Sequence, residues 1–311
     1  MKKMYICFWV TLFIVSGLFA QEWSEIQQII ASDGEYNDQF GNDVDISGDY
    51  AVVGSFYNAD STGAAYIYHR NGTLWEEQIK LTASDGSIGD FFGCAVSISG
   101  DFVVVGARGD DEELGAAYVF HRNGNFWDEQ VKLIASDGEI GDKFGSPVCI
   151  DGDNILAGAF AENDYTGAAY VFYNTGTEWI EQVKLTASDG MPNDCFGISV
   201  SMDGEYLVIG APFDDINSSC SGSAYIFHKN GTSWEEQSKV SYFDEDNFGP
   251  FATSVSISGD YLVCGALFDE GYCIASGSAY MFQRNGTTWI EHSKITSSVG
   301  SFFMFLDAQF F

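Results

Sequence analysis

Hydrophobic and polar positions recur along the chain, and one unit of the pattern predicts four short strands. Within residues 93–133, "CAVSISG" and "NFWDEQVKL" alternate between apolar and polar positions, which is typical of strands with one packed face. "DFVVVGA" is continuously apolar, which predicts a strand covered on both faces. "GAAYVFHR" is rich in strand-forming residues. The intervening "SGD" and "RNG" carry the glycine that tight hairpin turns favour, so each unit is expected to be a four-stranded antiparallel sheet.

Aromatic residues give the length of the unit. Trp23, Trp75, Trp127 and Trp179 are 52 residues apart, and Trp234 and Trp289 follow at intervals of 55. Phe-Gly pairs recur every 52 residues, at Phe40, Phe92, Phe144, Phe196 and Phe248. The fourth unit carries extra residues in "PFDDINSSCSG", and the next connection, "SYFDEDNFG", is expected to be shortened in compensation.

A unit of this size cannot bury both of its faces alone, so neighbouring units must stack on one another. Four-stranded antiparallel units that recur at this length predict an all-β fold, a β-propeller. The chain supplies five complete repeats plus a partial sixth.

The repeat resembles a known family. "FGISVSMDGEYLVIGAP", from Phe196 to Pro212, resembles the FG-GAP repeat that builds the headpiece propeller of integrin α subunits, and "FGCAVSISGDFVVVGA" and "FATSVSISGDYLVCGA" are similar. The resemblance covers nearly all of residues 23–296 and is closest to secreted bacterial-type FG-GAP proteins. It implies extracellular recognition and no catalysis. Integrin-type blades often hold calcium in a DxDxDG loop, whereas the turn here is "SGD" or "DGE", and a seven-bladed ring would need a longer chain.

The two ends of the chain differ from the repeats. Residues 1–20 combine "MKK", an apolar run and Ala20, which predicts a secretory signal peptide. The apolar run is shorter than a membrane-spanning helix needs, and a retained anchor is the alternative. Residues 21–296 form the predicted propeller, and residues 297–311 a degenerate or truncated tail. "EWSEIQQII" matches a fourth strand without a blade of its own. Either the ring closes with few blades and spare strands, or the chain is a truncated member of a longer family.

The formal net charge is -32 at pH 7. Such a surface repels nucleic acid and anionic lipid, so neither nucleic-acid binding nor membrane insertion after signal cleavage is expected. The acidic residues are spread through every repeat, which favours a solvated exterior. A secreted or cell-surface location is predicted.

The connections between units carry a recurring aspartate two residues before the Phe-Gly phenylalanine: Asp38, Asp90, Asp142, Asp194 and Asp246. Calcium loops place oxygen donors at alternate positions and end in a bidentate acid, which "SDGSIGD" does not. Short aspartate side chains also brace tight turns by accepting backbone hydrogen bonds. A structural turn is therefore predicted, in which the phenylalanine anchors the loop and its glycine permits close backbone approach. No metal or cofactor is expected, and calcium is the alternative.

The connections between the second and third strands vary from unit to unit, as recognition loops on a rigid scaffold do. Residues 55–63, 107–115, 159–167, 212–222 and 267–277 are the predicted rim loops. Their candidate binding residues are Asp110, Asp111, Asp164, Asp214, Asp215 and Asp269. The expected partner is an extracellular protein or glycan. The alternatives are a module of a larger adhesin or extracellular enzyme, and a hydrolase with its site in the central channel.

No catalytic residue is predicted. His69, His121 and His228 share one repeat position, whereas a catalytic histidine is normally singular and paired with a nucleophile or metal. The chain has seven cysteines. Cys220 and Cys273 fall in corresponding loops of neighbouring units, so a disulfide between them is possible in an exported protein.

Overall fold

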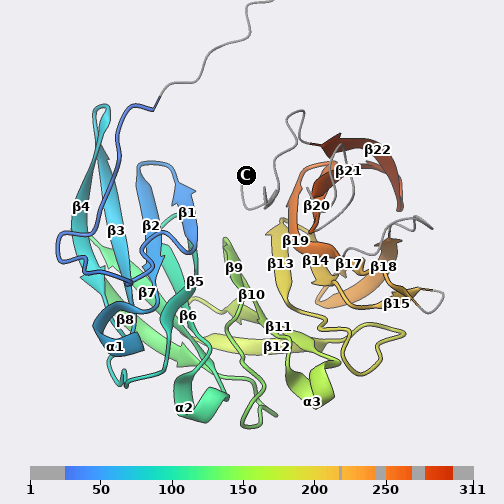
Figure 1. Cartoon of the computed structure of the whole chain (residues 1–311), viewed down its shortest axis with the longest axis horizontal. Coiled ribbons are helices and arrows are strands. Elements are labelled where there is room, and N and C mark those ends of the chain that lie inside the picture. Colours follow the sequence, from blue (N-terminus) through green and yellow to red (C-terminus); the bar gives the residue numbers. More distant parts are fainter. Residues whose placement is uncertain (1–24, 217–218, 242–249, 268–276, 297–311) are drawn as a thin grey trace, which may run out of the picture.

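The computed structural model describes residues 25–216, 219–241, 250–267 and 277–296. It contains five four-stranded antiparallel sheets in which sequential strands are neighbours. Figure 1 shows these blades following one another around an arc, from β1–β4 on the left to β19–β22 on the right. The predicted all-β propeller architecture with four-stranded antiparallel blades is confirmed.

The strands of each blade have the following bounds. The first blade contains β1 (Val44–Ser47), β2 (Tyr50–Ser55), β3 (Ala64–Asn71) and β4 (Leu74–Leu81). The second contains β5 (Phe92–Ser99), β6 (Phe102–Ala107), β7 (Ala116–Asn123) and β8 (Phe126–Leu133). The third contains β9 (Val148–Asp151), β10 (Asn154–Ala159), β11 (Ala168–Asn174) and β12 (Trp179–Leu185).

The fourth blade contains β13 (Ser199–Asp203), β14 (Tyr206–Ala211), β17 (Ser223–Asn230) and β18 (Ser233–Ser241). The fifth contains β19 (Phe251–Ser258), β20 (Tyr261–Ala266), β21 (Ser278–Asn285) and β22 (Thr288–Thr296). The connections between the second and third strands hold three helical turns and a small hairpin: α1 (Asn58–Ser61), α2 (Asp110–Glu113), α3 (Glu162–Tyr165), and β15 (Asp215–Ile216) with β16 (Ser219–Cys220).

The hydrophobic core lies between successive blades. The continuously apolar second strands are buried on both faces, and Val103, Val104 and Val105 of β6 are fully buried. One face of the first blade, which includes Val52 and Ile67, packs with residues of the second blade in a single cluster. Because each interface repeats the same pairing, every inner blade depends on both of its neighbours for burial.

The Phe-Gly pair fixes each blade to the one before it. Phe144 is fully buried and packs edge-on against Tyr170 of its own blade, with ring centroids 5.6 Å apart. Its backbone N–H donates to the Leu114 carbonyl of the preceding blade at 3.0 Å. A Cβ atom on Gly106 would lie 1.9 Å from the carbonyl oxygen of Gly145. Only glycine permits this approach of two backbones.

The fifth blade departs from the predicted spacing. Phe251 takes the place of the Phe-Gly phenylalanine, because it is buried and packs edge-on against Tyr280 at 5.6 Å. Ala252, with a φ of 63°, takes the place of the glycine. The prediction that assigned this place to Phe248 is wrong, because the longer fourth-unit loop is not offset by a shorter connection. Phe248 and Asp246 themselves lie outside the described residues.

The first blade has an open face. Ile46 of β1 is 60% exposed, whereas its counterpart Ile98 in β5 is 4% exposed, because no described blade precedes β1. Residues 25–32 run alongside this blade without forming a strand, and the side chain of Gln27 makes two 2.8 Å hydrogen bonds to the backbone of Trp75. The described strands of the fifth blade do not pack on those of the first as consecutive blades do.

Candidate functional site

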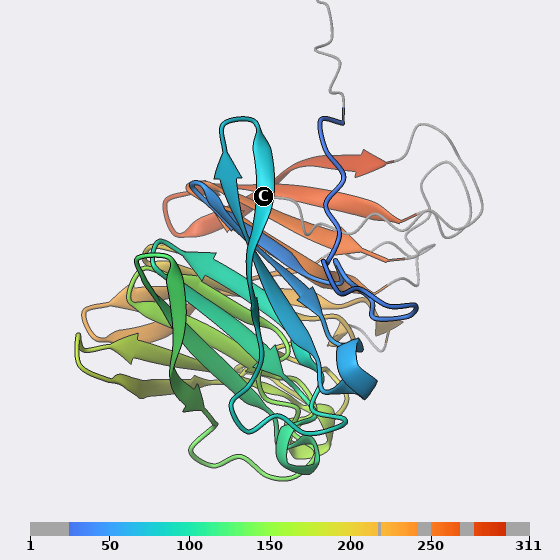
Figure 2. The same cartoon turned by 90° about the vertical axis from the view of Figure 1, so that its left-hand side faces the viewer.

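Three rim turns have the same backbone conformation and different sequences. The middle residues of α1, α2 and α3 take left-handed φ angles, for example 48° at Asp111 and 56° at Asp164. Left-handed geometry costs roughly 1–2 kcal/mol for a residue with a side chain. The cost is offset by hydrogen bonds, because the N–H groups of Gly141 and Lys143 in the next connection both donate to the Glu113 carbonyl. Figure 2 shows α1 at the end of its blade opposite the β3–β4 turn.

The candidate rim aspartates fall into two groups. Asp110 and Asp214 are 3% and 4% exposed. Each forms an ion pair with a lysine of its own blade, to Lys132 at 2.7 Å and Lys239 at 2.8 Å. Their carboxylates therefore serve the fold and are not displayed to a partner. Asp111 and Asp164 are exposed. Asp215 begins β15, and Asp269 lies outside the described residues.

The aspartates of the "SDG" turns bind a lysine and a tyrosine of the following blade. Asp85 accepts hydrogen bonds from the Tyr118 hydroxyl at 2.7 Å and from Lys132 Nζ at 2.9 Å, and these two bonds lower the pKa of Asp85. Tyr118 also bonds Asp110. The same tyrosine–aspartate–lysine arrangement includes Asp33, Asp137 and Asp189.

The aspartates two residues before the Phe-Gly pair brace their own turns. The backbone N–H of Ser87 donates to Asp90 at 2.6 Å, and that of Met191 donates to Asp194 at 2.7 Å. Asp38 and Asp142 make the corresponding bonds. All four are buried. Within the described ranges, no group of three or more histidine, cysteine or acidic residues is arranged to hold a metal ion.

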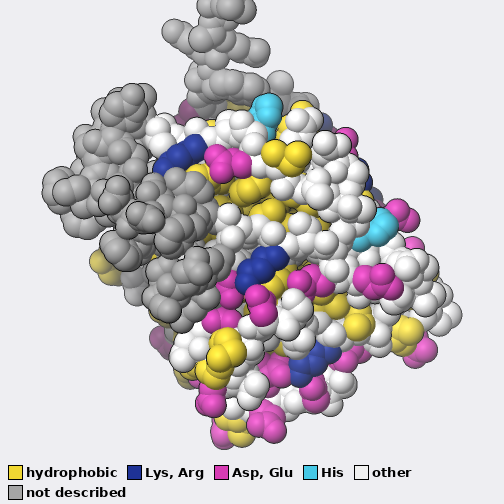
Figure 3. Space-filling model, turned by 90° about the vertical axis from the view of Figure 1, so that its right-hand side faces the viewer, with side chains coloured by type: hydrophobic (Ala, Val, Ile, Leu, Met, Phe, Trp, Pro, Cys, Tyr) yellow, Lys and Arg dark blue, Asp and Glu magenta, His cyan; other side chains and the backbone are white. Residues whose placement is uncertain are grey.

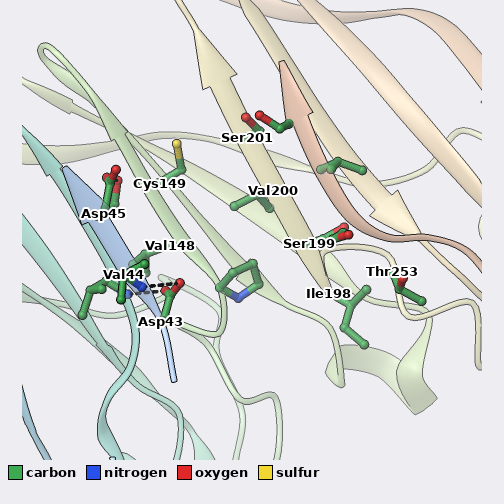
Figure 4. A pocket seen from close by; sticks show the side chains of 16 residues that line it. Asp43, Val44, Asp45, Val148, Cys149, Ile198, Ser199, Val200, Ser201 and Thr253 are labelled. Carbon is green, nitrogen blue, oxygen red and sulfur yellow. Dashed lines mark hydrogen bonds between the residues drawn. The ribbon is translucent and has the colours of Figure 1, made fainter. Parts of the chain in front are cut away.

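The first strands of all five blades surround a cavity of about 250 Å³. Figure 4 shows Asp43 and Asp45 on one side of it, with Cys149 and the serines of β13 around the remainder. Burial raises the pKa of Asp45, although the carboxylate accepts bonds from Ser97 and Ile98. Burial also raises the pKa of Cys149 to about 12, so this thiol stays protonated at neutral pH and is a poor nucleophile.

One set of hydrogen bonds recurs between the strands around this cavity, beside others such as the one that the Ser199 hydroxyl donates to the Ala252 carbonyl. In the recurring set, the side chain on the earlier blade accepts, and the backbone N–H on the next blade donates: Val96 to Asp43, Ile150 to Ser97, Gly204 to Asp151, and Ile257 to Ser201. Side chains of the first strands therefore help to hold the blades together at each of the four boundaries between described blades.

The three repeated histidines lie away from this cavity. His69, His121 and His228 each pack on an aromatic ring at the start of the second strand, with centroids 4.5–4.7 Å apart. Their shared repeat position is visible in the sequence, whereas their aromatic partners are a result of the fold.

The sequence profile of the FG-GAP repeat matches five stretches, residues 23–68, 75–120, 127–172, 179–227 and 234–282. The chain belongs to the FG-GAP repeat family. Each match after the first begins in the fourth strand of one blade and ends in the third strand of the next, so the family's repeat unit is offset from the blade by one strand.

This FG-GAP repeat protein is similar to the crystal structure of a protein from Lactobacillus plantarum. The TM-score is 0.56 and the sequence identity 13%, and the match covers 82% of this chain and 71% of that chain. At this identity the similarity supports the fold alone.

Figure 3 shows one face on which acidic side chains are dispersed among hydrophobic and neutral polar ones. Cys94, Cys149, Cys195 and Cys264 are free. The proposed Cys220–Cys273 pairing, the signal peptide (1–20) and the tail (297–311) lie outside what the structure describes. No helix among the described residues has the length and apolar character to cross a membrane.

Proposed function

We propose that this protein is a secreted or cell-surface FG-GAP propeller that binds an extracellular protein or glycan, without catalysis, through its rim turns. The observation that carries the proposal is the shared conformation of α1, α2 and α3. The middle residues of these turns, 59–61, 111–113 and 163–165, keep one left-handed geometry while their side chains differ. A constant backbone that presents variable side chains is suited to recognition. Sparsely populated backbone conformations also cluster at ligand-binding sites.

The chemistry of the cavity between the first strands supports the non-catalytic part of the proposal. Hydrogen bonds between blades engage five of its polar side chains, those of Asp43, Asp45, Ser97, Ser199 and Ser201. No histidine is among its lining residues. A hydrolase would need a nucleophile within hydrogen-bond reach of a general base.

The test is a glycan and matrix-protein array probed with the purified protein, followed by charge reversal at the rim. Glu112→Lys and Asp164→Lys should each reduce binding to the captured partner by at least about tenfold. Asp128→Lys is the matched control, since Asp128 is an exposed acidic residue on β8, and it should leave binding unchanged. Equal binding by all three variants would contradict recognition by the rim turns.

A further inference from the structure

At the end opposite the rim turns, blades are joined by a cation that stacks on an aromatic ring of the preceding blade. The guanidinium carbon of Arg122 lies 4.4 Å from the ring centroid of Tyr50, and Arg122 Nη1 donates to the Tyr50 hydroxyl at 3.0 Å. Arg284 lies 4.4 Å from the ring of Tyr206 in the same way. Each arginine also pairs with an aspartate of its own blade: Arg122 with Asp101 and Arg284 with Asp260.

The boundary between the second and third blades lacks this cation. Phe102 occupies the position of Tyr50, but Asn174 stands where the other blades have Arg122 and Arg284. Asp153, the counterpart of Asp101, is exposed and forms no ion pair within the described part of the chain. The boundary between the third and fourth blades is different again, because there Lys229 supplies the cation, 3.3 Å from Asn154 Oδ1 and 5.8 Å from the Tyr173 ring of the third blade.

A cavity of about 540 Å³ opens at this boundary. Its walls include Phe102, His121, Gln130, Glu178 and Trp179. The ring of Phe102 lies 5.5 Å from Trp179, edge-on, and 4.5 Å from His121. The volume falls within the roughly 300–1,000 Å³ of ligand pockets.

A second difference accompanies the missing cation. At two other boundaries a tryptophan indole N–H donates to a glutamine of the preceding blade, from Trp127 to Gln78 at 3.3 Å and from Trp234 to Gln182 at 3.2 Å. No corresponding bond joins Trp179 to Gln130 among the described residues. The boundary between the second and third blades therefore lacks both an inter-blade cation and an indole–glutamine hydrogen bond. The boundaries on either side of it have both.

We infer that this cavity binds a guanidinium group brought by another molecule, such as an arginine side chain of a partner polypeptide. The group would stack on Phe102, as Arg122 stacks on Tyr50, and would lie beside Glu178 of the cavity wall. Asp153, at the repeat position of the Asp101 that pairs with Arg122, would be its second carboxylate partner. A guanidinium is planar, so it stacks flat on an aromatic face and pairs with a carboxylate through two parallel N–H donors, whereas an ammonium is a compact point charge without this fork. The net charge of -32 also attracts cationic ligands. This site is independent of the rim turns proposed above.

Calorimetry with the purified protein tests the inference with three probes: N-acetyl-arginine amide, a peptide with one central arginine, and the same peptide with lysine. Both arginine probes should bind, and the lysine peptide should bind about tenfold more weakly, a difference of about 1.4 kcal/mol. Equal affinity for the two arginine probes would identify the guanidinium group alone as the ligand. Tighter binding of the peptide would identify a polypeptide partner.

Three variants separate the site from the rest of the surface. Asn174→Arg places a guanidinium in the cavity from within the chain and should abolish binding, and Phe102→Ala should weaken it at least about tenfold. Asn71→Arg, the same substitution at an exposed position in the β3–β4 region of the first blade, should leave binding unchanged. Absence of arginine binding to the wild-type protein, or equal binding by wild type and Asn174→Arg, would overturn the inference. If Asn174→Arg does not fold, unchanged binding by Phe102→Ala would overturn it as well.

Discussion

The backbone N–H of Ile98 donates a hydrogen bond to the carboxylate of Asp45 across the first blade boundary, at 2.8 Å. Asp45 also accepts bonds from the Ser97 hydroxyl and from the backbone of Ile46. This one carboxylate therefore joins the first strands of two blades and also accepts a hydrogen bond from a backbone N–H of the edge strand β1. Its burial raises its pKa, and a pH-dependent contribution to stability follows.

Because the folded pKa of Asp45 lies above the unfolded value near 3.8, protonation favours the folded state. The contribution of Asp45 is fully present below the unfolded value and is lost as pH rises through the folded pKa. Asp45→Asn removes this titration, so the wild type should gain stability relative to the variant as pH falls from about 7 to about 4. Urea unfolding of both proteins across this range measures the difference. A difference that does not change with pH would contradict the prediction.

Asp85 should show the opposite pH dependence. The Tyr118 hydroxyl and Lys132 lower its pKa, so its stabilising contribution is present above the unfolded value and is lost as pH falls through the folded pKa. Asp85 is half exposed, so Asp85→Asn should reduce the free energy of unfolding by only about 1 kcal/mol near neutral pH. The deficit should shrink in acid. Guanidinium chloride unfolding at several pH values would detect it, and a deficit that grows in acid would refute the assignment.

The fifth blade allows a test of which phenylalanine, Phe251 or Phe248, fills the buried position of the Phe-Gly pair. Phe251→Ala should lower the free energy of unfolding by about 3–5 kcal/mol, because it empties a buried ring site. Phe248→Ala, which removes the phenylalanine that follows the 52-residue spacing, should cost less. Thermal unfolding of the two variants compares them directly. A larger loss in Phe248→Ala would restore the spacing predicted from the sequence.

The approach of Gly106 to the next blade predicts intolerance of any side chain there. Gly106→Ala would place a methyl group against the Gly145 carbonyl oxygen and should cost more than about 3 kcal/mol. Gly100→Ala is the control, since nothing lies within 4 Å of its added carbon, and it should cost only about 1–2 kcal/mol for its left-handed φ. Chemical denaturation measures both, and comparable losses would show that crowding at the boundary is unimportant.

Calcium should not stabilise the protein. The ammonium group of Lys132 already lies between Asp85 and Asp110, 2.9 Å and 2.7 Å from their carboxylates, in a place that a cation would otherwise take. The melting temperature should therefore be the same in millimolar calcium and in excess chelator. An increase of many degrees that chelator reverses would mean that a calcium site exists.

Local patterning was sufficient to predict the blades. The alternation in "CAVSISG" and the apolar run in "DFVVVGA" correspond to β5 and β6, because strand periodicity and burial are properties of short segments. The register of the fifth blade was missed, because the spacing does not reveal which of two nearby phenylalanines, Phe248 or Phe251, enters the core. The tryptophan interval of 55 residues was the available signal.

The candidate site was predicted less well than the fold. The variable loops were located correctly as connections between second and third strands, but burial separates Asp110 from Asp111 although they are adjacent in sequence. The opening beside Asn174 was not foreseen, although the loss of a basic residue at that repeat position is visible in the sequence. The sequence alone does not show that this loss opens the boundary, because the contact of Arg122 with the preceding blade is a tertiary one.

At each of the four boundaries between described blades, a backbone N–H on the later blade donates to a side chain on the earlier one. Every inner blade thus presents backbone N–H donors to the blade before it and side-chain acceptors to the blade after it. A duplicated gene segment encoding one such unit would arrive with matching surfaces already in place, so the array can lengthen or shorten in evolution by whole units without inventing a new interface.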